Sequence, residues 1–107
     1  MNTRYSKLLL AFLLLILIVP QVVADEPPED GPYVEYYDDG KKKSEAHYKN
    51  GKLDGLRTGW HDNGQKSIEA HYKNGEQDGL VTVWNEDGNK TLEIQYKDGE
   101  EISRKDF

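Results

Sequence analysis

The chain has 107 residues, a formal net charge of −6, 32% charged residues and no cysteine. This length suggests one domain. The absence of cysteine excludes disulfides and a lipidated cysteine anchor, and the acidic excess disfavours nucleic acid and anionic lipid as partners.

The N-terminal segment has the pattern of a secretory signal peptide over residues 1–24. Arg4 and Lys7 precede an apolar run at residues 8–19, and Pro20 and Ala24 follow. This run is shorter than the about 20 residues that cross a bilayer. We therefore predict cleavage near Ala24 and a secreted or periplasmic product. An uncleaved membrane anchor is the alternative.

Cleavage would remove Arg4 and Lys7, two of the fourteen basic residues, and make the net charge more negative, from −6 to −8. The next segment, DEPPEDGP at residues 25–32, is acidic and rich in proline. Such a composition predicts a solvated linker. The remaining residues, 33–107, form the predicted domain.

This domain repeats with a period of 24 residues. HYKNGKLDGL at residues 47–56 returns as HYKNGEQDGL at residues 71–80. Written from its aromatic residue, the repeat gives units 36–59, 60–83 and 84–107. A fixed period without insertions indicates a repeat architecture.

Asx-Gly pairs divide each unit into short segments. Asp39-Gly40 and Asn50-Gly51 are examples of dipeptides that accept positive φ at both central positions of a tight hairpin turn. Between them, segments such as SIEAHY alternate with period two, as strands do. We predict an all-β fold, an elongated antiparallel meander of consecutive β-hairpins in a single twisted sheet. The predicted turn glycines are Gly40, Gly51, Gly55, Gly64, Gly75, Gly79, Gly88 and Gly99.

One apolar stripe is predicted to lie on a single face of this sheet, with Val81 and Val83 on the other face. Ser44 weakens the stripe in the first unit, and the charged tail EEISRKDF is predicted to cap the last edge in place of a strand. The stripe comprises Leu56, Trp60, Ile68, Ala70, Tyr72, Leu80, Trp84, Leu92, Ile94 and Tyr96. Because exposed aromatic strips mark interaction sites, the candidate partner-binding residues are Tyr36, Tyr48, Trp60, Tyr72, Trp84 and Tyr96.

The sequence EAHY, which occurs twice, is the only candidate for metal chemistry. Glu45, His47, Glu69 and His71 could form an imidazole–carboxylate ladder, but the third unit has Gln95 instead of histidine. A solvated polar face is the preferred interpretation, and His61 is read as incidental. No serine has the context of a nucleophile, so we predict no catalytic residues. We also predict no metal and no cofactor.

The segments YKNGKLDGLRTGW and YKNGEQDGLVTVW resemble the MORN repeat in its bacterial variant. The resemblance extends from Gly31 to Gly99, and in the third unit only Tyr96 and Gly99 fit the pattern. It implies an elongated sheet of hairpins, a binding partner and no catalysis. Many bacterial proteins of this kind, the YwqK-like group, carry the label of antitoxin. The matching residues are Tyr48, Gly51, Gly55 and Trp60, and then Tyr72, Gly75, Gly79 and Trp84.

We therefore predict an exported module for protein–protein interaction that is not an enzyme. Two alternatives stay open. One is an antitoxin or immunity protein that neutralises a toxin, and the other is a structural envelope protein that self-associates through its edge strands. Nucleic acid is not expected as a partner. Membrane contact is expected only through the N-terminal segment if it stays uncleaved.

Overall fold

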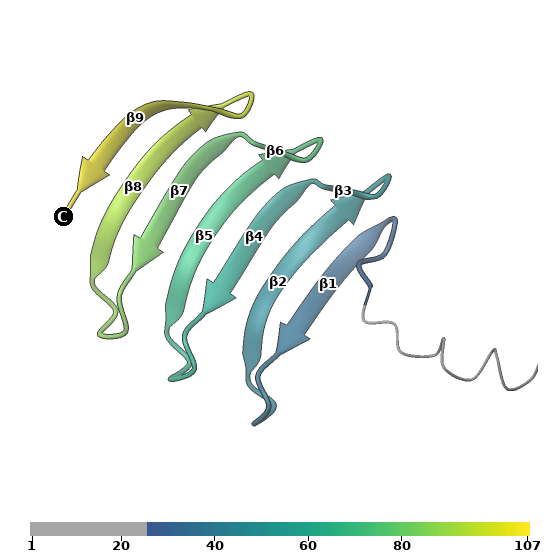
Figure 1. The fold of residues 1–107 in the computed structure, drawn as a ribbon, viewed down its shortest axis with the longest axis horizontal. Coiled ribbons are helices and arrows are strands. Elements are labelled where there is room, and N and C mark those ends of the chain that lie inside the picture. The colour runs from purple at the N-terminus through teal and green to yellow at the C-terminus, as the bar shows by residue number, and fades with distance from the viewer. Residues whose placement is uncertain (1–25) are drawn as a thin grey trace, which may run out of the picture.

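The computed structural model describes residues 26–107, and their regular secondary structure is entirely β-strand (Figure 1). The predicted signal peptide, its alternative as an anchor and the first linker residue lie outside the described residues. No helix that could cross a membrane occurs in the described part. The strands are β1 (Gly31–Tyr36), β2 (Lys42–Lys49), β3 (Lys52–Leu53), β4 (Gly55–Trp60), β5 (Lys66–Lys73), β6 (Glu76–Gln77), β7 (Gly79–Trp84), β8 (Lys90–Lys97) and β9 (Glu100–Asp106).

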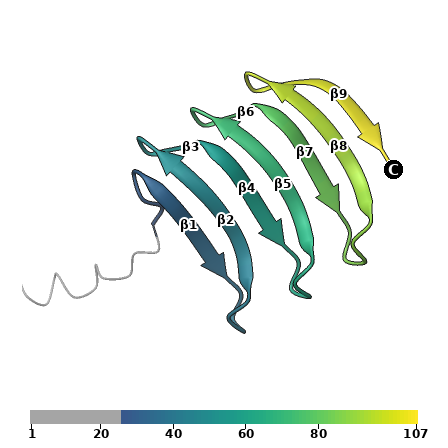
Figure 2. The same ribbon diagram turned by 180° about the vertical axis from the view of Figure 1, so that it is seen from behind.

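The strands form one open antiparallel sheet in the order β1-β2-β4-β5-β7-β8-β9, while the short β3 and β6 pair with β2 and β5. The predicted all-β meander of hairpins is confirmed. Figures 1 and 2 show the curved sheet from its two sides. Within residues 26–107, no second layer covers either face.

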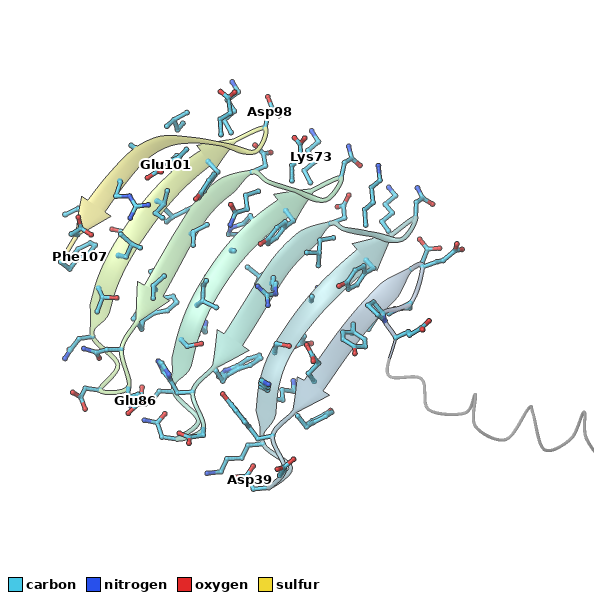
Figure 3. The ribbon with its side chains drawn as sticks, viewed as in Figure 1. Asp39, Lys73, Glu86, Asp98, Glu101 and Phe107 are labelled. Atoms are coloured by element: carbon cyan, nitrogen blue, oxygen red, sulfur yellow. The ribbon has the colours of Figure 1, made fainter. Side chains whose placement is uncertain are left out.

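Two-residue turns join the strands at one end of the sheet. Asn50 and Gly51 have φ values of 52° and 76°, and Asn74-Gly75 and Asp98-Gly99 repeat this pattern. Positive φ at both positions defines a type I′ turn, whose twist matches that of the flanking strands. Figure 3 labels Asp98 in one of these turns, with Lys73 at the same end of the sheet. The prediction is confirmed at these three turns.

The turns at the opposite end, where Asp39 and Glu86 are labelled in Figure 3, differ from the prediction. Gly40 has positive φ, whereas Asp39, which the structure also describes, does not. The Gly40 N–H donates to the Tyr37 carbonyl and the Tyr37 N–H donates to the Lys41 carbonyl, at 2.9 and 2.8 Å. This is a three-residue loop, in which a type I turn precedes a left-handed glycine. The two-residue turns predicted at this end are therefore wrong.

The C-terminal segment also differs from the prediction. Residues 100–106 form β9, which pairs with β8 along its length, and each of them is exposed. Because an edge strand keeps both rows of its side chains in water here, its charges do not prevent backbone pairing. A register shift at Gln95/Tyr96 replaces the Asp-Gly step of the earlier units. The predicted cap is thus a strand whose charges lie on the sheet edge.

The other edge strand begins earlier than the predicted domain start at residue 33. β1 includes Gly31 and Pro32, which lie opposite Tyr48 and His47. Before it, the Glu29 carbonyl accepts a hydrogen bond from the Gly51 N–H at 2.8 Å. The last part of the expected linker is therefore joined to the sheet by backbone pairing.

The strand register assigns side chains to two faces, and it contradicts the single predicted stripe. Val81 lies opposite Ile94, whereas Leu80 lies opposite Gln95. Val81 and Val83 therefore belong to the apolar face, and Leu80 and Trp84 to the reverse face. The reason is geometric: the two-residue turn after β5 places even-numbered residues of β5 opposite odd-numbered residues of the following strands.

We call the apolar side the tyrosine face and the other the tryptophan face. The tyrosine face comprises Tyr33, Ala46, Tyr48, Ile68, Ala70, Tyr72, Val81, Val83, Leu92, Ile94 and Tyr96. The tryptophan face comprises Val34, Tyr36, Glu45, His47, Leu56, Thr58, Trp60, Glu69, His71, Leu80, Thr82, Trp84, Glu93 and Lys105.

The core lies on the tyrosine face in the C-terminal half of the sheet. Ala70, Val81 and Ile94 are 1%, 4% and 7% exposed, and partly buried apolar residues of β5, β7 and β8 pack around them. In the first unit the apolar contacts are fewer, and the Tyr33 and Tyr48 rings meet edge to face at 6.2 Å. Burial here comes from cross-strand neighbours, because a covering layer is absent from residues 26–107.

We expect Val81→Ala to lower the free energy of unfolding by about 1.5 kcal/mol, since it removes two buried methyl groups. The neighbouring Leu80→Val removes one methylene from a side chain that is already 39% exposed and should cost about 0.5 kcal/mol. Urea denaturation followed by circular dichroism measures both. A larger loss for Leu80→Val than for Val81→Ala would contradict the assignment of faces.

Candidate interaction surfaces

On the tryptophan face, a lysine links each repeat to the aromatic ring of the next. Lys42 Nζ lies 3.3 Å from Glu45 Oε2 and 5.7 Å from the centre of the Trp60 ring. An ammonium at this distance from a ring is attracted by its negative face. We call this arrangement of lysine, glutamate and aromatic ring a rung.

The rung occurs twice more along the sheet. Lys66 Nζ is 2.8 Å from Glu69 Oε2 and 5.8 Å from the Trp84 ring centre. Lys90 is placed in the same way, 3.7 Å from Glu93 and 5.5 Å from the Phe107 ring centre. Phe107 follows β9, whose shorter path brings it one residue early into the place of a tryptophan. Its ring is labelled beside the C-terminal end of β9 in Figure 3.

The three-residue loops are also tied from one repeat to the next. The Tyr37 hydroxyl donates to the Trp60 carbonyl at 2.6 Å. One repeat later, His61 Nε2 lies 2.9 Å from the Trp84 carbonyl. Because a carbonyl only accepts, this histidine nitrogen carries the proton. His61 is therefore not incidental, as the sequence suggested, but joins neighbouring repeats.

The histidines of the EAHY segments make main-chain contacts. His47 Nδ1 lies 3.3 Å from the Leu56 carbonyl, and His71 Nδ1 lies 3.2 Å from the Leu80 carbonyl. Glu45 and Glu69, the other members of the considered ladder, are paired with lysines. The described residues contain no group of three or more histidine, aspartate or glutamate side chains that could hold a metal ion.

The six candidate aromatic residues lie on opposite faces of the sheet. Tyr48, Tyr72 and Tyr96 lie on the tyrosine face, each directly opposite a glycine on the neighbouring strand. Tyr36, Trp60 and Trp84 lie on the tryptophan face, so the six do not form one strip. Trp84 lines a shallow hollow of about 260 Å³ together with Gln65, Lys66 and Gly88.

Sequence reasoning missed the lysines of the rungs and Phe107. The signal was present, since Lys42, Lys66 and Lys90 share the 24-residue spacing and each precedes a glutamate by three residues. Spacing of three residues in a plain strand places two side chains on opposite faces. The register shifts beside these lysines change that alternation and bring lysine and glutamate together.

The family model for the MORN repeat variant matches residues 29–50, 53–74 and 77–98. The chain belongs to this family. Each matched segment spans one hairpin, β1–β2, β4–β5 or β7–β8, from the Asp-Gly step to the type I′ turn. No curated protein and no solved structure matches the chain.

MORN repeats are generally non-catalytic and are consistent with modules for protein or membrane interaction. The third MORN repeat, residues 77–98, contains Asp78-Gly79 and Tyr96 and is as complete as the others in the structure. Gly79 has φ of 113°, and a Cβ there would lie 3.3 Å from His71 Cβ. Glycine is therefore favoured at this position for two reasons: other residues rarely adopt this φ, and a Cβ would crowd His71.

We expect Tyr37→Phe to lower the free energy of unfolding by about 1 kcal/mol, because it removes the hydrogen bond to the Trp60 carbonyl. Tyr36→Phe is the matched control, since the Tyr36 side chain is 59% exposed and its change should be near zero. Urea denaturation of both variants measures the two changes in the free energy of unfolding. Equal effects would contradict the role of the Tyr37 hydroxyl.

We expect Lys66→Met to cost about 0.5–1 kcal/mol, because a partly exposed cation–π contact and a surface ion pair are both lost. Lys73→Met, an exposed lysine outside the rungs, should have no measurable effect. The same denaturation experiment in low and high salt measures this. The Lys66 effect should shrink with salt, and an unchanged difference would argue against an electrostatic rung.

Proposed function

We propose that this chain is a non-catalytic interaction module that binds a protein partner on the open tyrosine face of its sheet. The carrying observation is the apolar surface around the core. Ala70, Val81 and Ile94 are buried, but the five apolar residues packed against them are only partly buried. Apolar surface left open by a single-layer sheet is typical of an interaction site.

Polar recognition would come from two arginines beside the core on that face. Arg57 lies on the interior strand β4 opposite Ala70, and Arg104 lies on the edge strand β9 opposite Ile94. Arg104 donates to Glu101 at 2.7 Å, and the hydrogen bond and charge of this carboxylate raise the pKa of Arg104. Apolar core residues flanked by charged side chains resemble the composition of protein interfaces.

We also propose that the chain is exported. The support is the N-terminal sequence, in which two cations, an apolar run and Ala24 follow one another as in cleaved signal peptides. The binding partner would then be a protein of the cell envelope or the exterior. Mass spectrometry of the intact protein from the native cell would show a start at Asp25 if Ala24 is the cleavage site.

An antitoxin or immunity role is the second candidate. It is supported by the charge, because 20 acidic residues against 14 basic ones favour steered association with a basic toxin. Export would fit a secreted toxin rather than one that acts in the cytosol. Co-expression with the product of the neighbouring gene tests this role, and a failure to rescue growth would remove it.

The interaction function itself is tested by capture of a partner from the native envelope. We expect saturable binding that is reduced about tenfold by Tyr72→Ser, which removes an aromatic ring from the tyrosine face. Leu80→Ser on the tryptophan face is the matched control and should bind as the parent does. Both variants are first checked for folding by circular dichroism.

Two results would contradict the proposal. One is the absence of any saturable partner. The other is a molar mass, measured by light scattering, that rises with concentration until large assemblies form, which would favour the self-associating structural alternative. A constant monomer mass together with a saturable partner supports the interaction module.

A further inference from the structure

The two edges of the sheet differ in charge. The β9 edge carries Glu100, Glu101, Arg104, Lys105 and Asp106 among its seven residues. Charged edge strands resist the addition of another strand. The β1 edge, GPYVEY, has one charged residue, so it is the more open edge for a partner.

The series of rungs is closed at the β9 edge. Phe107 is contacted by Lys90 and also by Lys105, whose Nζ lies 4.7 Å from the ring centre. The last aromatic ring of the series therefore already has two cations from within the sheet, although Phe107 is 57% exposed.

At the β1 edge the series is open. Tyr36 lies 24 residues before Trp60 and holds the same place in the first repeat, at the end of the first strand of a hairpin. Within the described part, no lysine is placed over its ring, and the side chain is 59% exposed. Trp60 and Trp84, which have their lysines, are less exposed. Tyr36 thus has an aromatic face available for a cation.

The backbone of β1 is also open toward the outside. The Asp54 N–H donates to the His47 carbonyl. The backbone N–H and carbonyl groups of odd-numbered residues in β2 therefore point away from β1. By alternation, Tyr33 and Glu35 use their backbone groups toward β2, while Val34 directs its N–H and carbonyl outward. A hollow of about 320 Å³ lies along this strand, lined by Tyr33, Val34, Glu35 and Tyr36. A strand added here would find both a donor and an acceptor.

Charge indicates which strand would fit. Glu29 and Asp30 precede β1. At the other end Asp38 and Asp39 follow it, but Asp39 is paired with Lys41 at 3.8 Å, and Lys42 and Lys43 come next. A basic segment would therefore be attracted chiefly at the Glu29–Asp30 end. A second copy is disfavoured, because antiparallel pairing of two β1 strands about Val34 would bring Asp30 of one copy against Asp38 of the other.

We infer that the outer edge of β1 binds an extended, lysine-bearing segment of a protein partner, which adds as a further strand and places its lysine over Tyr36. This inference rests on the proposed interaction function and names one of its sites. The fold supplies the precedent. β5 lies beside β7 with Lys66 over Trp84, and β2 lies beside β4 with Lys42 over Trp60.

The precedent supplies the probe, which is a fluorescent peptide with the β5 sequence KSIEAHYKN, residues 66–74. We expect saturable binding to the purified chain by fluorescence anisotropy. Tyr36→Ala should weaken it about two- to fivefold, the value of an exposed cation–π contact. Lys66→Met in the peptide should have the same effect on the parent protein and none on Tyr36→Ala.

Val34→Pro tests strand addition directly, because it removes the outward N–H and proline is tolerated at such edge positions, as at Pro32. We expect at least tenfold weaker peptide binding. Asp106→Pro at the β9 edge is the matched control and should leave binding unchanged, because Asp106 lies opposite Leu92 and by the same alternation directs its N–H outward. If Val34→Pro does not fold, the amide signal of Val34 in the parent protein is followed by NMR during the titration and should shift.

The inference is overturned if the peptide does not bind, if Val34→Pro binds it as the parent does, or if Asp106→Pro abolishes binding instead. A second copy as the true occupant would appear as a concentration-dependent dimer lost in Val34→Pro, and would also overturn it. Envelope capture separates this site from the proposed function. A partner still captured by Val34→Pro at parental affinity would keep the module and exclude the β1 site.

Discussion

Lateral pairing between neighbouring strands is the interaction on which the rest of this structure depends. Within residues 26–107 the sheet has one layer, so a strand obtains its burial, its hydrogen bonds and its side-chain contacts from the strands on either side. The rungs, the Tyr37 bond to Trp60 and the His61 bond to Trp84 all run from one repeat to the next. Stability in such an array is a sum of nearest-neighbour terms. A fixed 24-residue period is the condition for each of these contacts to recur.

The two faces of the sheet differ in their side chains and in the contacts that these make. The tyrosine face collects small and branched residues in its centre, and its tyrosines lie opposite the glycines of the Asp-Gly steps. The tryptophan face mixes polar side chains with the partly exposed Leu56 and Leu80, and its two tryptophan rings are contacted by lysines that pair with glutamates. A lysine stem can cover an aromatic ring while its ammonium stays in water. The chain therefore keeps one face wet and leaves the other partly apolar and open to a partner.

Much of the fold could be predicted from local sequence. The Asn-Gly turns and the strand periodicity depend on residues that are close together in the chain, and the repeat period can be read directly from the sequence. The face assignment failed because Leu80 and Trp84 were ranked by hydrophobicity, although the two-residue turn already sets Val83 opposite Ile68 and so places Val81 and Val83 on the face of Ala70. The candidate aromatic residues were likewise grouped by type, and Tyr72 and Trp84 proved to lie on opposite faces. The β9 strand was missed because its charges look unlike a strand, while an exposed edge has no need of apolar residues.

Local sequence was enough to predict the class of fold, the repeat period and the repeat family, because glycine position and alternation act over a few residues. Which side chains meet depends on the three-dimensional alignment of the strands. The register shifts that join Lys66 to Glu69, the loop that brings His61 to the Trp84 carbonyl, and the contrast between the β1 and β9 edges all depend on residues about 20 or more positions apart in sequence or on displaced alternation. Such contacts are set by how strands align across the sheet, and a linear pattern of residue types does not contain that alignment.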